Sequence, residues 1–201
     1  LIETAKKGMN DKSGLIVVLD TSSSMTAAVP GLKVSSYDVG KSMALYFSYL
    51  LKGKFNRAYL EFADKCAMRF WGGKSPVEDL QLDRNEAYGS TNFQAVGDVF
   101  ANLLLNGVPE SEFPTGILCI SDGCFNSTYS NETNHVTLLK KLRLAGFSEE
   151  FVENFKVILW DIPNNYYGSR EQTAFEDFAN SPNLFHMSGL DGSAIAFING
   201  T

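Results

Sequence analysis

Apolar residues follow two patterns along the chain: short unbroken runs, and longer stretches in which they recur at helical spacing. The run 15–19, Leu-Ile-Val-Val-Leu, shows no alternation of apolar and polar positions. Such a run predicts a strand buried on both faces, as in a parallel sheet covered by helices. Two runs joined by Ala63-Asp64-Lys65 predict a hairpin, which requires one antiparallel strand. The expected strands span residues 15–20, 57–62, 66–71, 116–120, 155–160 and 184–187.

Helical spacing fills most of the intervals between these strands. The first helix is expected to begin after a cap at Ser35 or Ser36 and to continue to about Lys52. Because strands and helices alternate, we predict an α/β domain with a doubly wound, mainly parallel six-stranded sheet, one antiparallel edge strand and helices on both faces, a Rossmann-like arrangement. We expect one domain over residues 1–201, with 1–12 as a lead-in segment, cut from a longer chain. The further helices are expected at residues 93–106, 136–142, 149–153, 170–179 and 194–198.

The stretch Gly72-Gly73-Lys74-Ser75 matches part of a phosphate-binding loop. The complete motif needs a glycine five positions before Gly73, where Met68 stands. It also needs a helix directly afterwards, and the sequence continues with Pro76 instead. We therefore interpret this stretch as a turn.

Acidic and hydroxyl residues follow the expected parallel strands. Asp20 and Asp122 each end a strand, and the carboxyl ends of parallel strands meet at one edge of the sheet. Ser22 and Ser24 follow at alternate positions, so in an extended segment their side chains share a direction. With Thr91, which precedes the second helix, they suit a small hard cation such as Mg²⁺ or Mn²⁺. For residues 20–24 alone, an ordinary loop or helix cap explains the serines equally well.

Together these parts resemble the von Willebrand factor type A domain and its metal-ion-dependent adhesion site. The matching segments are Asp20-Thr21-Ser22-Ser23-Ser24, Gly89-Ser90-Thr91-Asn92 and Ser121-Asp122-Gly123. The resemblance covers nearly the whole chain. Its details are similar to an intracellular branch that includes the Ro RNA-binding proteins and uncharacterised proteins of plants, fungi and viruses. Ser23 departs from the pattern, since many relatives have glycine there, and so does the polar insertion 126–134.

The resemblance implies a role for each of the five residues. Ser22 and Ser24 would bind the cation directly, and Thr91 directly or through water. Asp20 and Asp122 would act largely through bound water or as hydrogen-bond acceptors. With few anionic groups bound directly, the cation stays electrophilic, and a carboxylate of a partner protein can replace one of its waters. The leading hypothesis is a protein-interaction module, not an enzyme, that binds an Asp or Glu side chain through Mg²⁺ or Mn²⁺.

Two other functions stay open at this point. A cation beside Ser22 and Ser24 could support phosphoryl transfer, although Asp20 lacks the second acid that follows it in aspartyl-phosphate hydrolases. The domain could also be structural, within a larger Ro-like RNA-binding or viral protein. Loops at the same sheet edge are expected to carry specificity. The candidate partner contacts there, which could equally cover the sheet edge, are Tyr129, Tyr166 and Tyr167.

The composition indicates which kinds of partner and which cellular compartment are expected for this protein. A net charge of −6, without a cluster of basic residues beyond Lys140-Lys141, disfavours direct nucleic-acid binding. No apolar stretch approaches the roughly 20 residues of a membrane span, and no membrane partner is expected. The 3 cysteines show no disulfide framework, which indicates a reducing compartment. Three N-glycosylation sequons, at Asn126, Asn131 and Asn199, point the other way. We expect an intracellular protein.

Overall fold

The computed structural model describes residues 14–82, 88–123, 125, 132–163 and 181–190. Six strands of this part of the chain form one sheet in the order β3-β2-β1-β4-β5-β6. Every neighbouring pair is parallel except β2–β3, so the predicted mainly parallel α/β sheet with one antiparallel edge strand is confirmed. The strands are β1 (Leu15–Asp20), β2 (Ala58–Phe62), β3 (Cys66–Phe70), β4 (Gly116–Ser121), β5 (Lys156–Asp161) and β6 (Leu184–Ser188).

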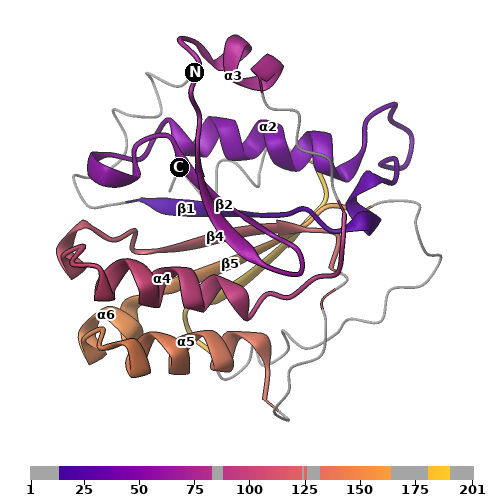
Figure 1. Cartoon of the computed structure of the whole chain (residues 1–201). Coiled ribbons are helices and arrows are strands. Elements are labelled where there is room, and N and C mark those ends of the chain that lie inside the picture. The colour runs from indigo at the N-terminus through magenta and orange to yellow at the C-terminus, as the bar shows by residue number, and fades with distance from the viewer. Residues whose placement is uncertain (1–13, 83–87, 124, 126–131, 164–180, 191–201) are drawn as a thin grey trace.

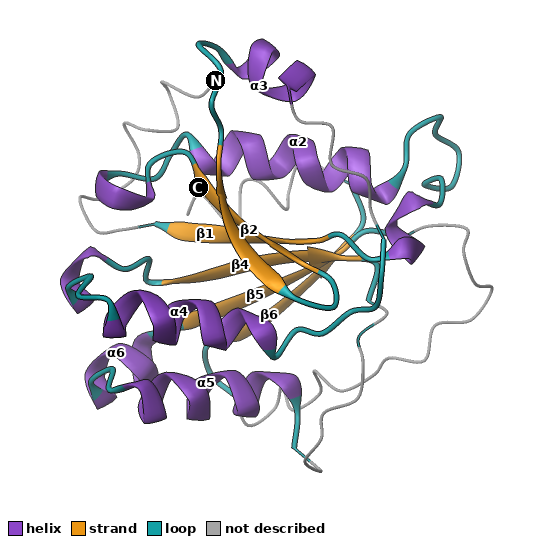
Figure 2. Ribbon diagram, viewed as in Figure 1, coloured by secondary structure: helices purple, strands orange, loops and turns teal. Residues whose placement is uncertain are grey.

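Helices cover both faces of this sheet, as Figures 1 and 2 show. Helix α2 (Ser36–Ser48) packs on one face, whereas α4 (Ala95–Leu105), α5 (Asn134–Ala145) and α6 (Glu149–Asn154) lie on the other. In β1, Val18 belongs to the core beneath α4 and α5, and Leu19 to the core beneath α2. The unbroken apolar run is therefore a strand with two buried faces. None of the described helices has the length and apolarity needed to cross a membrane.

Helix α2 starts where the sequence predicts but ends earlier. Ser35 and Asp38 form a capping box: the Ser35 hydroxyl accepts from the Asp38 amide at 3.1 Å, and the Asp38 carboxylate accepts from the Ser35 amide at 2.9 Å. The helix ends at Ser48 instead of Lys52, because the chain turns back into β2 and the Arg57 amide takes the Ser48 carbonyl at 2.9 Å. The helices expected at 170–179 and 194–198 and the lead-in segment 1–12 lie outside the described residues.

The turn at residues 72–75 is followed by a helix, so one sequence-based expectation is wrong. Helix α3 (Pro76–Leu82) begins at the proline itself. Proline is favoured in the first turn of a helix because its missing N–H would be unpaired there anyway. Ser75 supports this start, since its hydroxyl accepts from the Glu78 amide at 3.2 Å. Residues 72–75 themselves form no helix or strand, and the Lys74 amide donates to the Glu78 carboxylate in the first turn of α3 at 2.7 Å.

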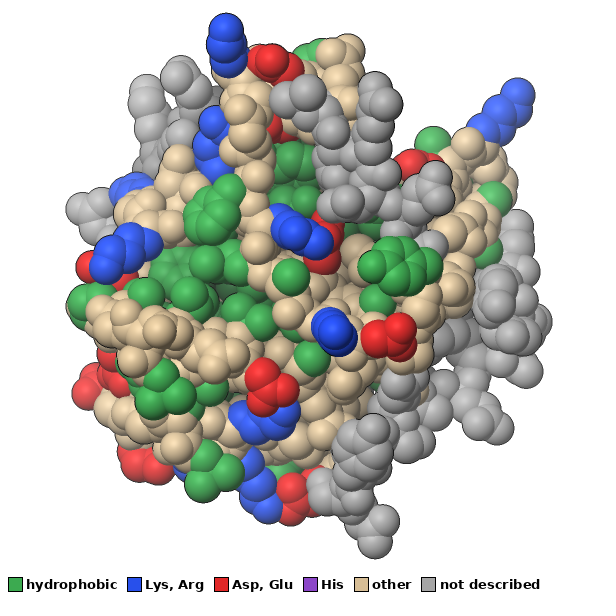
Figure 3. All heavy atoms as spheres, viewed as in Figure 1, with side chains coloured by type: hydrophobic (Ala, Val, Ile, Leu, Met, Phe, Trp, Pro, Cys, Tyr) green, Lys and Arg blue, Asp and Glu red, His purple; other side chains and the backbone are tan. Residues whose placement is uncertain are grey.

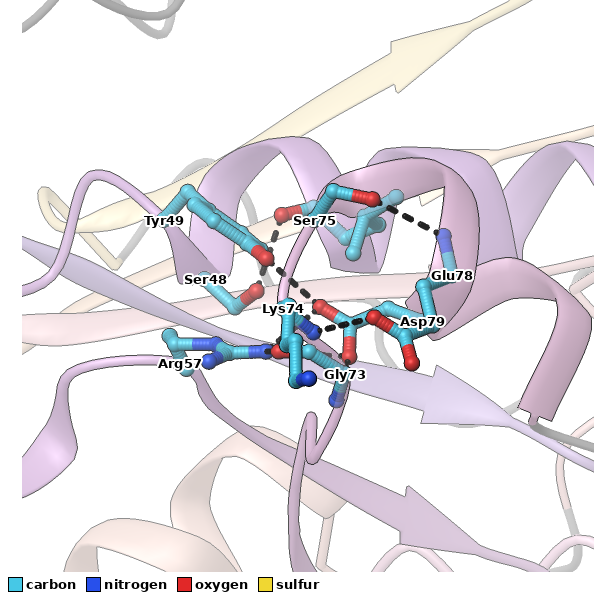
Figure 4. A network of polar contacts seen from close by, with 9 residues as sticks. Ser48, Tyr49, Arg57, Gly73, Lys74, Ser75, Glu78 and Asp79 are labelled. Atoms are coloured by element: carbon cyan, nitrogen blue, oxygen red, sulfur yellow. Dashed lines mark hydrogen bonds and ion pairs between the residues drawn. The ribbon is translucent and has the colours of Figure 1, made fainter.

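A buried acid, Asp79, holds α3 against α2 and the start of β2 (Figure 4). Its carboxylate accepts from the Tyr49 hydroxyl at 2.6 Å, from Arg57 Nη2 at 2.7 and 2.9 Å, and from the Gly73 amide. Burial alone would raise the pKa of Asp79, but these hydrogen bonds and the Arg57 charge outweigh it and lower the pKa. The network therefore neutralises a buried charge entirely with groups of the chain.

Removing this acid is expected to destabilise the fold without affecting the carboxyl edge of the sheet. Asp79→Ala removes the acid that pairs with Arg57, and we expect the free energy of unfolding to fall by about 2–3 kcal/mol, since Arg57 keeps some access to water. Tyr49→Phe, which removes one hydrogen bond, is expected to cost about 1 kcal/mol. Urea denaturation measures both changes. An Asp79→Ala protein with the wild-type midpoint would contradict the anchoring role.

Candidate metal centre

The strand order reverses between β1 and β4. Strand β1 leads through α2 to β2 on one side, whereas β4 leads through α5 to β5 on the other. The register pairs Leu19 with Ile120, so Asp20 and Ser121 are neighbours at the carboxyl edge. Crevices of open α/β sheets form at this kind of reversal. The structure therefore brings the ends of the two acid-bearing strands together where the sequence predicts it.

Asp20 is a fully buried carboxylate, and both of its oxygens accept hydrogen bonds. Its Oδ1 accepts from the Ser22 amide at 2.8 Å, and its Oδ2 accepts from the Ser121 hydroxyl at 2.6 Å. Burial raises the pKa of Asp20 to about 7 although these hydrogen bonds lower it, and the charge of the nearby Asp122 raises it further. Asp122 is itself fully buried. Two desolvated carboxylates at one point are the environment that a bound cation stabilises.

Ser22 and Ser24 converge beside these acids. A short 3-10 helix, η1 (Ser23–Thr26), follows β1, and its turn is closed by the Met25 amide, which donates to the Ser22 carbonyl at 3.2 Å. Met25 is buried in the core beneath α2, so the turn is fixed from below. The two serine hydroxyl oxygens lie 3.2 Å apart, and both side chains are buried. Neighbouring ligands of octahedral Mg²⁺ are separated by about 2.9 Å, so this pair fits two adjacent positions with little movement.

Thr91 reaches the same edge on the segment 88–92. Before it, the Tyr88 amide donates to the Thr21 carbonyl at 2.7 Å, and the Gly89 carbonyl accepts from the Ser23 amide at 3.2 Å. After it, the Asn92 amide donates to a carbonyl of the β2–β3 hairpin at 2.8 Å. Gly89 has a φ of +88°, a conformation that favours glycine. Thr91, which is buried, is thus held against the segment that carries the two serines.

The structure also identifies residues that the sequence analysis did not single out. Ser121 precedes Asp122 and holds the Asp20 carboxylate; the available signal was a hydroxyl residue at the last position of a strand beside an acid. Tyr88, three residues before Thr91, is 73% exposed, and its amide donates to the Thr21 carbonyl beside the site. The expected rim residues Tyr129, Tyr166 and Tyr167 lie outside the described residues.

The donor set consists of oxygens with low total charge. Among the described residues, no three Asp, Glu, His or Cys side chains group together as a metal cluster would. The candidate centre instead combines two carboxylates with three hydroxyls. Oxygen-only ligands suit Mg²⁺ and Mn²⁺, and two carboxylates balance the charge of a divalent ion.

Comparison with known proteins identifies the fold. No protein-family model matches the sequence, and no curated protein sequence is significantly similar to it. Among solved structures, the Ro (RSR) protein of Deinococcus radiodurans is similar over 94% of this chain, with 16% identity and a TM-score of 0.57. The manganese-loaded TRAP protein of Plasmodium vivax is similar over 94% of this chain and 72% of its own, with 17% identity and a TM-score of 0.53. The chain has the von Willebrand factor type A fold.

Another solved structure with this type A fold carries a metal. Proximal thread matrix protein 1 of the mussel byssus, whose metal-ion-dependent adhesion site holds zinc, is similar over 93% of this chain and 46% of its own, with 16% identity and a TM-score of 0.50. The present chain spans 34% of the length of the Ro protein. Identities this low establish the type A fold alone.

The buried Asp20 predicts an unusual pH dependence of this type A fold without divalent cations. Between about pH 4 and pH 7 the folded protein keeps the Asp20 proton, whereas the unfolded chain, with the ordinary pKa of 3.8, has lost it. The free energy of unfolding is therefore expected to fall as pH rises through this range, by at most about 1.4 kcal/mol per pH unit for one proton. Above about pH 7 this loss is complete.

The matched variant is Asp20→Asn, whose side chain is neutral at every pH. It is expected to show a flatter profile and, without metal, to be more stable than the wild type at about pH 8. Urea denaturation in the presence of a chelator measures both profiles. Parallel profiles of the two proteins would contradict the raised pKa of Asp20.

Proposed function

We propose that this protein is a divalent-cation-dependent protein-interaction module whose cation, Mg²⁺ or Mn²⁺, accepts a carboxylate from a partner. The observation that carries the proposal is the convergence of two buried carboxylates with a pair of buried serine hydroxyls at the strand-order reversal. The manganese in TRAP and the zinc-occupied adhesion site of the mussel protein support a metal site in this fold. In the proposed site the metal ligands are Ser22, Ser24, Thr91, Asp20 and Asp122.

Each side chain has a role that follows from its surroundings. Ser22 and Ser24 bind the cation directly through hydroxyls that already lie 3.2 Å apart. Thr91 adds a third hydroxyl, directly or through water. Asp20 and Asp122 balance the charge largely through water, since both oxygens of Asp20 already accept hydrogen bonds from the chain. The cation would supply a positive charge, and neutral hydroxyl ligands do not neutralise it. An anionic group of a partner therefore binds to it strongly.

An acidic protein side chain is the ligand that this arrangement favours. The two acids of the site offset a divalent charge, so an incoming Asp or Glu meets little local repulsion. Tyr88, whose amide donates to the Thr21 carbonyl between Asp20 and Ser22, is exposed and offers apolar contact to residues that flank the acid. The tyrosines expected at the rim from the sequence, Tyr129, Tyr166 and Tyr167, stay candidates for the same role.

The surface does not favour nucleic acid as the partner. The net charge is −6, and on the face shown in Figure 3 the Lys and Arg side chains are interspersed with Asp and Glu instead of forming a continuous basic area. Binding to phosphates depends on such basic surfaces. We propose an intracellular protein partner, with any RNA binding carried by other parts of a longer protein.

We also propose that the site binds without catalysing a reaction. A serine–histidine mechanism at Ser22 or Ser24 needs a histidine close by to act as the general base. His186 lies on β6, three strands away from β1 in the sheet. His135 lies on the core-facing side of α5, where neither of its ring nitrogens has a hydrogen-bond partner and where burial lowers its pKa. Neither position serves the serines of the candidate centre.

Metal binding is tested by titrating the protein with Mg²⁺ and Mn²⁺ and measuring its stability and heat of binding. At a cation concentration of about a hundred times Kd, we expect the free energy of unfolding to rise by about 2.7 kcal/mol. Asp20→Ala and Ser22→Ala are expected to weaken binding by at least about tenfold. Ser42→Ala is the matched control, because the same substitution removes an exposed hydroxyl that bonds to the Asp38 carbonyl within α2, outside the proposed ligand set. The proposal would be overturned if neither cation stabilised or bound to the wild type or the Asp20→Ala protein.

The partner chemistry is tested by selecting from a displayed library of random peptides on the Mg²⁺-loaded protein. Selected peptides are expected to contain an Asp or Glu whose change to Asn or Gln weakens binding by about tenfold or more, and to dissociate when chelator is added. Asp20→Ala is the control surface for the selection. Peptides without an essential acid, or binding that survives chelator, would contradict carboxylate recognition. Mg²⁺-dependent hydrolysis of a phosphate ester that Asp20→Ala abolishes would identify an enzyme instead.

A further inference from the structure

The turn of the β2–β3 hairpin contacts the segment that carries Thr91. Asp64, in this turn, accepts hydrogen bonds from both the amide of Ser90, at 3.0 Å, and its hydroxyl. These two bonds, the hydroxyl first, lower the pKa of Asp64. On the other side of Thr91, the Asn92 amide donates to the Ala63 carbonyl at 2.8 Å, and its side-chain amide donates to the Asp64 carbonyl at 3.3 Å. Thr91 is thus bracketed by two residues that are both fastened to the same turn.

The contact is closely fitted at Gly89. A Cβ on this glycine would lie 2.8 Å from Asp64 Oδ2, so the carboxylate rests directly against the Gly89 backbone. The positive φ of Gly89 turns the chain so that its carbonyl faces the Ser23 amide on one side while Ser90 faces Asp64 on the other. The segment therefore passes between η1 and the hairpin turn, with a fixed contact on each side.

We propose that Asp64 is a positioning residue of the metal centre: it fixes Ser90 and thereby holds the Thr91 hydroxyl where the cation needs it. This inference rests on the proposed function, because it assigns a role to Asp64 only if Thr91 serves a cation. The Asp64 side chain acts through Ser90, and it is not itself a ligand.

The reason is the cost of ordering a loop ligand. Ser22 and Ser24 belong to a turn that is anchored by β1 and the buried Met25, so they are in place before the cation arrives. Thr91 belongs to a connecting segment, and a segment that must be ordered during binding weakens that binding by its lost conformational freedom. Groups that orient metal ligands through hydrogen bonds typically change metal affinity by about 10–100-fold. Asp64 is placed to have this effect on Thr91.

The experiment compares the Mn²⁺ and Mg²⁺ affinities of the wild type, Asp64→Ala, Asp64→Asn, Ser90→Ala and Lys65→Ala by calorimetric titration. Asp64→Ala is expected to weaken both affinities by about tenfold or more, with an unchanged stoichiometry of one ion. Asp64→Asn keeps an oxygen that accepts from Ser90 and is expected to bind within about threefold of the wild type. Ser90→Ala keeps only the amide bond and is expected to fall between these two. Lys65→Ala, an exposed neighbour in the same turn, is expected to leave the affinities unchanged.

The double variant Asp64→Ala/Ser90→Ala separates positioning from general charge effects. If Asp64 acts through Ser90, the double variant binds no more weakly than Asp64→Ala alone. Equal losses in Asp64→Asn and Asp64→Ala would overturn positioning in favour of a simple attraction between the cation and the acid. Wild-type affinity of Asp64→Ala, or a loss that is confined to stability without metal, would also overturn it. A wild type that binds neither cation would instead contradict the proposed function itself.

Discussion

The burial of the Asp20 carboxylate at the end of a strand covered on both faces is the constraint on which this structure depends. A central strand of a doubly wound sheet has no exposed side, so an acid at its last position loses its water. The Ser22 amide and the Ser121 hydroxyl compensate only part of that loss, and the pKa of Asp20 rises to about 7. The packing that makes the sheet stable thus creates a site with an unmet preference for positive charge.

A second buried acid in the same chain shows what full compensation requires. Asp79 receives an arginine, a tyrosine hydroxyl and a backbone amide, and its pKa is lowered despite its burial. Asp20 receives hydrogen bonds from neutral groups of Ser22 and Ser121, and its charged neighbour is another acid, Asp122. The chain therefore neutralises one buried carboxylate with its own cation, and surrounds the other with groups that suit a cation from solution. This difference separates a structural network from a candidate binding site.

The strands and the edge chemistry could be predicted from the sequence because both depend on local pattern. The apolar runs at 15–19 and 116–120 predict the two central strands. The acids come directly after these runs, so the same pattern places them at the carboxyl edge of the sheet. The helix at Pro76 was missed because a proline stops a helix or starts one depending on its position within the turn. The contacts of Ser121 with Asp20 and of Asp64 with Ser90 could not be predicted, since the partners lie 101 and 26 residues apart in the sequence. Contacts of that kind depend on sheet order, which local pattern does not specify.

The antiparallel hairpin gives this sheet a feature that a purely parallel one lacks. After β2 the chain turns back at residues 63–65 on the same edge where β1 ends, so the turn lies beside the candidate centre. Its carbonyl and carboxylate groups then contact the segment 88–92 from the side opposite η1. A crossover helix, which a parallel neighbour of β2 would require, would carry the chain away from this edge. The antiparallel hairpin thus provides the second set of contacts that hold the segment carrying Thr91, opposite those made by η1. The position of Thr91 therefore depends on the strand arrangement at this side of the sheet.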